Sequence, residues 1–113
     1  MHELAITQSV MKIALKTAQE NGAKRIKTIR LQLGDYSDVM PEYVEKYFDL
    51  VSRDTIACGA HIEAYRVRAR IRCEACGAEN EIERGRGRCP ICGSDTIKML
   101  SGTQCLVESI EVE

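Results

Sequence analysis

Four of the six cysteines form two C-x2-C pairs, Cys73 with Cys76 and Cys89 with Cys92. A two-residue gap lets both sulfurs of a pair reach one ion from a tight turn, and zinc prefers tetrahedral thiolate coordination. A glycine follows each pair, so the backbone can bend there at little steric cost. The pattern predicts one Zn(II) ion held by all four sulfurs.

This predicted zinc site is closed, because four thiolates fill a tetrahedral shell and leave no position for water or substrate. We therefore expect the zinc to be structural and not catalytic. The alternative is a redox-active CxxC pair, which the presence of two tandem pairs disfavours.

The N-terminus, Met1-His2-Glu3, carries a second set of metal donors. His2 is too bulky for the usual removal of the initiator methionine, so we expect a free amine on Met1. That amine, the His2 amide and the His2 imidazole can close adjoining chelate rings, which favours square-planar Ni(II) or Cu(II). The Glu3 amide or an outside group could complete the set. The alternative interpretation is a frayed terminus, with Glu3 as an acid at a helix N-terminus.

Arginines are frequent before the first cysteine pair and between the two pairs. They could offset the negative charge of a zinc tetrathiolate and of nearby glutamates, or they could contact nucleic acid. No aromatic residue lies between Cys73 and Cys92 to stack on a base, and the net charge of the 113 residues is −1. We therefore prefer charge balance. The arginines are Arg66, Arg68, Arg70, Arg72, Arg84, Arg86 and Arg88.

Periodicity predicts the elements that must position these residues. Helices are expected over 3–21 and 41–55, the second with Val44, Tyr47 and Phe48 on its buried face. Strands are expected over 25–33, 62–72 and 104–112. In the second strand Ile62 is out of phase with Ile71, and a bulge near residues 64–65 would repair this. The last strand has Leu106 and Val112 in one phase.

The predicted fold class is α+β, a small sheet with two helices plus an inserted four-cysteine zinc-ribbon-like module. Residues 1–70 and 99–113 would form the nickel-binding α+β domain, and residues 71–98 the zinc-binding module. A chain of this length suits one ordinary domain, or one small domain plus a metal-stapled module.

Three remaining residues with reactive side chains are assigned ordinary roles. Cys58 and Cys105 are expected to be buried free thiols, with a disulfide or accessory metal binding as alternatives. His61 is expected at the surface. With two histidines, no Ser/His/Asp set and no phosphate-binding glycine loop, we expect no enzyme activity.

The start of the chain does not resemble a secretory signal, and no apolar run approaches the ~18 residues of a membrane span. We therefore expect a cytoplasmic protein in which the cysteines stay reduced.

Taken together, the chain resembles the HypA family of nickel metallochaperones for [NiFe]-hydrogenase maturation. The resemblance covers almost the whole length. It rests on the Met1-His2-Glu3 start, the Gly22-Ala23 helix end, the strand ending at Gly34, Phe48-Asp49-Leu50-Val51, both cysteine knuckles and the closing Ser109-Ile110-Glu111.

The resemblance implies a two-lobed fold with nickel held by Met1, His2 and Glu3, of which His2 is the key ligand, and zinc on the four knuckle cysteines. Its implied partners are a HypB-type maturation GTPase and the [NiFe]-hydrogenase large subunit, with urease and a homodimer as further options. Some family members carry extra histidines between the knuckles. The 12-residue spacer here has none, which leaves the fourth nickel donor open.

One function from a different class is kept as an alternative, a zinc-ribbon adaptor that binds nucleic acid or protein and has an inert N-terminus. Binding to DNA or RNA would be strongly salt-dependent.

Overall fold

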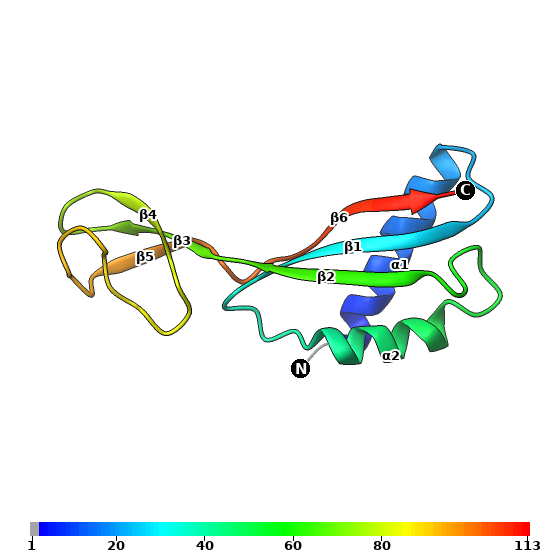
Figure 1. Ribbon diagram of the computed structural model, residues 1–113, viewed down its shortest axis with the longest axis horizontal. Helices are drawn as coiled ribbons and strands as arrows, with labels where there is room; N and C mark the ends of the chain where they lie inside the picture. Colours follow the sequence, from blue (N-terminus) through cyan, green and yellow to red (C-terminus); the bar gives the residue numbers. More distant parts are fainter. Residues whose placement is uncertain (1–2) are drawn as a thin grey trace. The chain divides into compact units, whose positions relative to one another are not determined.

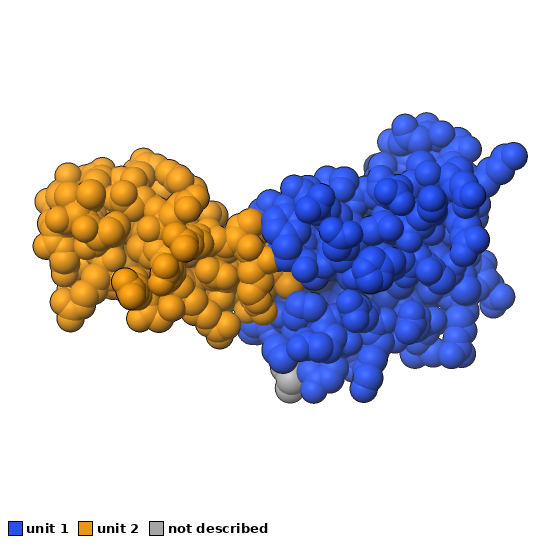
Figure 2. All heavy atoms as spheres, viewed as in Figure 1, with its two compact units in different colours: residues 1–32, 38–65, 106–113 blue, residues 33–37, 66–105 orange. Residues whose placement is uncertain are grey.

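The computed structural model describes residues 3–113. The order of elements in Figure 1 is helix, strand, helix and then five strands, which are labelled α1 to β6. The described chain divides into two compact units, coloured separately in Figure 2. Unit 1 comprises Met1–Gln32, Asp38–Tyr65 and Leu106–Glu113, and unit 2 comprises Leu33–Ser37 and Arg66–Cys105.

Helix α1, Glu3–Glu20, confirms the first predicted helix. Its buried side is a stripe at three- and four-residue spacing that includes Val10, Met11 and Ala14. The helix ends where predicted, because Gly22 adopts the left-handed conformation (φ 65°) that glycine tolerates.

Strand β1, Ile26–Gly34, confirms the first predicted strand, with Ile29, Leu31 and Leu33 buried on alternate positions. It is the middle strand of the sheet β2-β1-β6. Strand β6, Cys105–Val112, also forms as predicted, but Leu106 is 52% exposed, so its predicted apolar phase is not a buried face.

Helix α2, Pro41–Val51, forms where the second helix was predicted but is shorter. The prediction to residue 55 was wrong, because Asp54 has a left-handed backbone (φ 64°) that cannot continue an α-helix. The last helical bond runs from the Ser52 N–H to the Phe48 carbonyl oxygen. Val44 and Phe48 are buried as expected. Tyr47 was expected on the same face, but it is exposed.

The single strand predicted over 62–72 is two strands, β2 (His61–Val67) and β3 (Ala69–Cys73). The break at Arg68 solves the phase problem, since β2 buries Ile62 while β3 buries Ala69 and Ile71. No bulge at residues 64–65 is therefore needed. A register shift occurs instead between Arg70 and Ile71, where β3 pairs with β5.

The second sheet has the order β4-β3-β5 and lies in unit 2. Strand β4 is Glu79–Ile82 and β5 is Ile97–Ser101, and both pair antiparallel with β3. A small core of Ala69, Ile71 and Ile82 lies here, with Tyr36 and Ile97 packed against it. Two helices, small sheets and a four-cysteine module confirm the α+β prediction.

Neither described helix is long and apolar enough to cross a membrane.

Candidate metal centres

The four sulfurs of Cys73, Cys76, Cys89 and Cys92 converge in unit 2. All four Sγ atoms lie within 4.8 Å of one another, with 3.5 Å between Cys73 and Cys92 and 3.7 Å between Cys76 and Cys89. In a tetrahedral site with zinc–sulfur bonds of about 2.3 Å, the sulfurs stand about 3.8 Å apart. The donor set and its spacing therefore fit zinc.

The two knuckles that carry these sulfurs have the same local structure. The Gly77 N–H donates to the Cys73 carbonyl at 2.9 Å, and the Gly93 N–H donates to the Cys89 carbonyl at the same distance. Both glycines have a left-handed backbone, with φ of 78° and 77°. The glycine after each pair, noted in the sequence, thus closes each turn.

Backbone N–H groups also point at the sulfurs. The Cys76 amide donates to the Cys73 Sγ at 3.4 Å, and the Ile91 amide donates to the Cys89 Sγ at 3.4 Å. The first of these bonds is the main reason why the pKa of Cys73 falls to about 6. The amide of Cys92 likewise lowers the pKa of Cys89. One buried sulfur in each knuckle is therefore predisposed to the thiolate form that binds metal.

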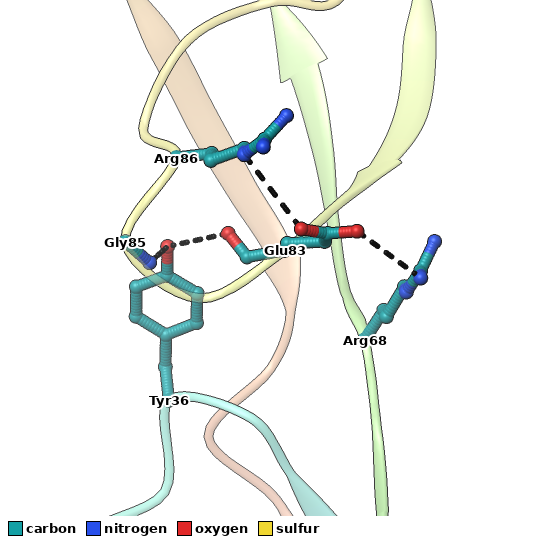
Figure 3. A network of polar contacts seen from close by, with 5 residues as sticks. All are labelled: Tyr36, Arg68, Glu83, Gly85 and Arg86. Atoms are coloured by element: carbon teal, nitrogen blue, oxygen red, sulfur yellow. Dashed lines mark hydrogen bonds and ion pairs between the residues drawn. The ribbon is translucent and has the colours of Figure 1, made fainter.

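The loop between the knuckles is held by the polar network in Figure 3. The Tyr36 hydroxyl accepts from the Gly85 amide at 3.3 Å and lies 3.5 Å from the Glu83 carbonyl oxygen. The Glu83 carboxylate pairs with Arg68 at 3.3 Å and with Arg86 at 3.6 Å. These arginines thus balance an acid beside the cysteine site. Sequence reasoning did not find the role of Tyr36, because this residue is 47 positions from Glu83.

Glu3 is fixed in unit 1 at the start of α1. It is only 6% exposed, and its carboxylate accepts the backbone N–H of Met40, the residue before α2, at 3.3 Å. Met1 and His2 lie outside the described residues. The described part of the predicted nickel site is therefore Glu3, whose side chain joins the two helix starts. No sequence pattern indicated this bond, which spans 37 positions.

The remaining reactive side chains are only partly as expected. His61 is exposed, as predicted. Cys58 and Cys105 are free thiols, but Cys58 is exposed and Cys105 half-buried, so the prediction that both are buried was wrong. Cys58 follows the early end of α2, in a turn that leaves it at the surface. Burial raises the pKa of the Cys105 thiol. Within residues 3–113, only the four knuckle cysteines form a group that could hold a metal ion.

Comparison with known sequences identifies the family. The profile of the family described as "Hydrogenase/urease nickel incorporation, metallochaperone, hypA" matches residues 1–112. The chain belongs to the HypA family. The resemblance seen in the sequence motifs is thereby confirmed.

Several relatives in this family are similar over their whole length. The hydrogenase maturation factor HypA of Geobacter metallireducens is 38% identical over 113 residues, which cover both chains completely. That of Geotalea uraniireducens is 39% identical with the same coverage. That of Rhizobium leguminosarum bv. viciae is 34% identical over 112 residues, or 99% of each chain.

Solved structures show the same fold. The solution structure of the Ni metallochaperone HypA from Helicobacter pylori matches with a TM-score of 0.74. The match covers 99% of this chain and 97% of that one, at 18% identity. A second HypA solution structure matches with the same score and identity.

Proposed function

We propose that this HypA-family chain is a cytoplasmic nickel metallochaperone that binds Ni(II) at its N-terminus and delivers it for [NiFe]-hydrogenase maturation. The observation that carries the proposal is the whole-length family match, together with the Met1-His2-Glu3 start. In this proposal the chain is a carrier and not an enzyme. Its partners are a HypB-type maturation GTPase and the hydrogenase large subunit, and urease is a further acceptor.

The nickel donors in this proposal are the Met1 amine, the His2 amide and imidazole, and a contribution from Glu3. The Glu3 carboxylate is buried and bonded to the Met40 amide. Its side chain therefore positions the terminus, and the backbone amide of Glu3 is the better fourth donor. Deprotonated amide nitrogens suit square-planar Ni(II).

Zinc in this proposal is structural, held by Cys73, Cys76, Cys89 and Cys92. Four converging sulfurs supply a full tetrahedral shell. The core of unit 2 contains only a few apolar side chains. A bound zinc ion would therefore supply folding free energy that the burial of apolar side chains in this unit does not.

Nickel titration of the untagged, zinc-loaded protein tests the proposal. We expect one equivalent of Ni(II) to give a yellow, diamagnetic, square-planar complex. His2→Ala should lower the affinity at least about tenfold, since a chelate-ring donor is lost. His61→Ala is the matched control, because His61 is exposed and lies outside the proposed site.

A protein extended by residues before Met1 lacks the free amine at that position and should not form this complex. If the extended protein or the His2→Ala variant binds nickel as well as the natural chain, the carrier role is wrong. The zinc-ribbon adaptor would then be the better interpretation.

A further inference from the structure

Helix α2 and Met40, the residue before it, expose a row of large apolar side chains, which we call the α2 stripe. It consists of Met40, Tyr43, Tyr47 and Leu50, which are 43%, 46%, 37% and 55% exposed. Tyr43, Tyr47 and Leu50 lie along one line of the helix surface at the spacing of a and d positions in a heptad. Met40 precedes them by three residues, in the extended backbone at the N-cap.

The α2 stripe lies beside the side of α2 that packs in the core, since Tyr47 is three residues after the buried Val44. The residues that α2 buries are Val44 and Phe48. The apolar surface of the helix is therefore broader than the part buried in unit 1, and the α2 stripe is the part left exposed. Scattered single apolar residues are normal at a surface, but a contiguous row with two tyrosines is typical of protein interfaces.

Two of the three charged residues that lie three or four positions from a residue of the stripe are positive, and the third is Asp54, four positions after Leu50. Lys46 lies three residues after Tyr43 and four before Leu50, so it is a surface neighbour of both. Arg53 follows Leu50 by three residues, just beyond the end of α2 at Val51. Both are exposed, and neither forms an ion pair within the part of the chain that the structure describes.

The first residue of the α2 stripe also contacts Glu3, which follows the two N-terminal residues of the proposed nickel site. This residue, Met40, donates its backbone N–H to the Glu3 carboxylate. A molecule that covers the stripe from this end would therefore lie next to the residue that follows Met1 and His2 in the chain.

We propose that the α2 stripe is the docking surface for an amphipathic helix of a partner protein, whose apolar residues repeat at heptad spacing and are flanked by acidic residues. A straight row of apolar side chains at heptad spacing is complementary to a second helix, because the a and d side chains of one helix pack between the side chains of the facing helix. The two basic neighbours, Lys46 and Arg53, favour acidic flanks over basic ones. The inference rests on the proposed function, because it assigns to this surface the task of bringing a partner to the nickel terminus.

A synthetic peptide can serve as the probe. We would use a fluorescein-labelled three-heptad helical peptide with leucine at a and d and glutamate at e and g, and the same peptide with lysine at e and g. Like charges keep either peptide from pairing with itself. In fluorescence anisotropy with the zinc-loaded protein, the acidic peptide should bind at least about tenfold tighter than the basic one, with a preference that weakens as salt rises.

Matched variants locate the contact. Leu50→Ser should weaken binding of the acidic peptide at least about tenfold. Leu106→Ser should leave it unchanged, because Leu106 is 52% exposed in the same unit but lies on β6. Lys46→Glu should reduce the preference for the acidic peptide more than Lys12→Glu, a control on α1.

The proposal is overturned if neither peptide binds, if both leucine variants weaken binding equally, or if the charge variants have the same effect. It is also overturned if sedimentation shows a dimer that Leu50→Ser converts to a monomer, since a second copy would then be the occupant. Nickel titration of Leu50→Ser should match that of the natural protein. If the natural protein takes up nickel but does not bind the acidic peptide, the docking proposal is wrong and the proposed function stands. If the natural protein fails to take up nickel, the proposed function is wrong.

Discussion

At the scale of single residues, Glu3 has two candidate roles, metal ligand and structural anchor, which its position in a Met-His-Glu start does not distinguish. A carboxylate next to the proposed nickel-binding terminus suggests an oxygen ligand, yet here it is buried and bonded to the amide that precedes α2. A carboxylate also suits the positive ends of helix dipoles, and Glu3 lies in the first turn of α1. Its side chain is therefore better explained as an anchor for the terminus than as a ligand.

This interpretation predicts different effects for two substitutions of Glu3. Glu3→Gln keeps an oxygen that can accept the Met40 N–H, and should cost less than about 1 kcal/mol of unfolding free energy. Glu3→Ala leaves that N–H without a protein acceptor, and should cost about 1–2 kcal/mol. Urea unfolding followed by circular dichroism measures both values.

Nickel titration of the same two variants separates anchor from ligand. As an anchor, Glu3 can be replaced by glutamine with nickel affinity within about twofold, whereas alanine loosens the terminus and weakens binding. If Glu3→Gln loses nickel as completely as Glu3→Ala while remaining as stable as the natural chain, the carboxylate is a ligand and the anchor role is wrong.

At the scale of elements, close backbone packing in unit 2 depends on a glycine. A Cβ atom added at Gly34, the last residue of β1, would lie 2.1 Å from the Gly102 carbonyl oxygen. The Gly34 N–H also donates to the Gln104 carbonyl at 2.9 Å. The chain just before β6 therefore passes directly against the end of β1, at a distance that only glycine permits.

We predict that Gly34→Ala destabilises the protein by about 1–3 kcal/mol, because backbone atoms of Gly102 must move to accept the methyl group. Gly87→Ala is the matched control, since a Cβ there meets nothing within 4 Å. It should change the unfolding free energy by less than about 0.5 kcal/mol. Equal effects of the two substitutions in thermal or urea unfolding would show that the contact at Gly34 does not limit stability.

The sequence predicted the elements that have a strong apolar period and missed those that have none. Helix α1 and strand β1 bury regular stripes, so both were found close to their ends. Strand β5 exposes two consecutive apolar residues, Met99 and Leu100. A short strand in which apolar and polar residues do not alternate has no periodic pattern from which it could be predicted. The knuckles were found because zinc chemistry fixes their spacing, whereas the Glu3–Met40 bond depends on tertiary packing alone.

At the scale of the whole molecule, the two units have cores of different strength. Unit 1 buries Phe48, Ile29, Leu31 and Val44 between two helices and a sheet. The core cluster of unit 2 is Ala69, Ile71 and Ile82, with two partly buried neighbours. Burial of so few side chains supplies little stability, so unit 2 should depend on the proposed zinc ion and unit 1 should not.

This difference predicts that removal of zinc unfolds one unit and spares the other. Metal binding to thiolates and folding are coupled, so a chelator, or acid that protonates the four cysteines, should release the ion and loosen unit 2. In hydrogen exchange at neutral pH, amides of β3, β4 and β5 should lose protection in the chelated protein, while those of α1 and α2 keep it. Cys73→Ser should reproduce the pattern without chelator, whereas Cys58→Ser, a free surface thiol, should not. Uniform loss of protection in both helices and all strands would mean that the zinc ion stabilises the whole chain as one cooperative unit.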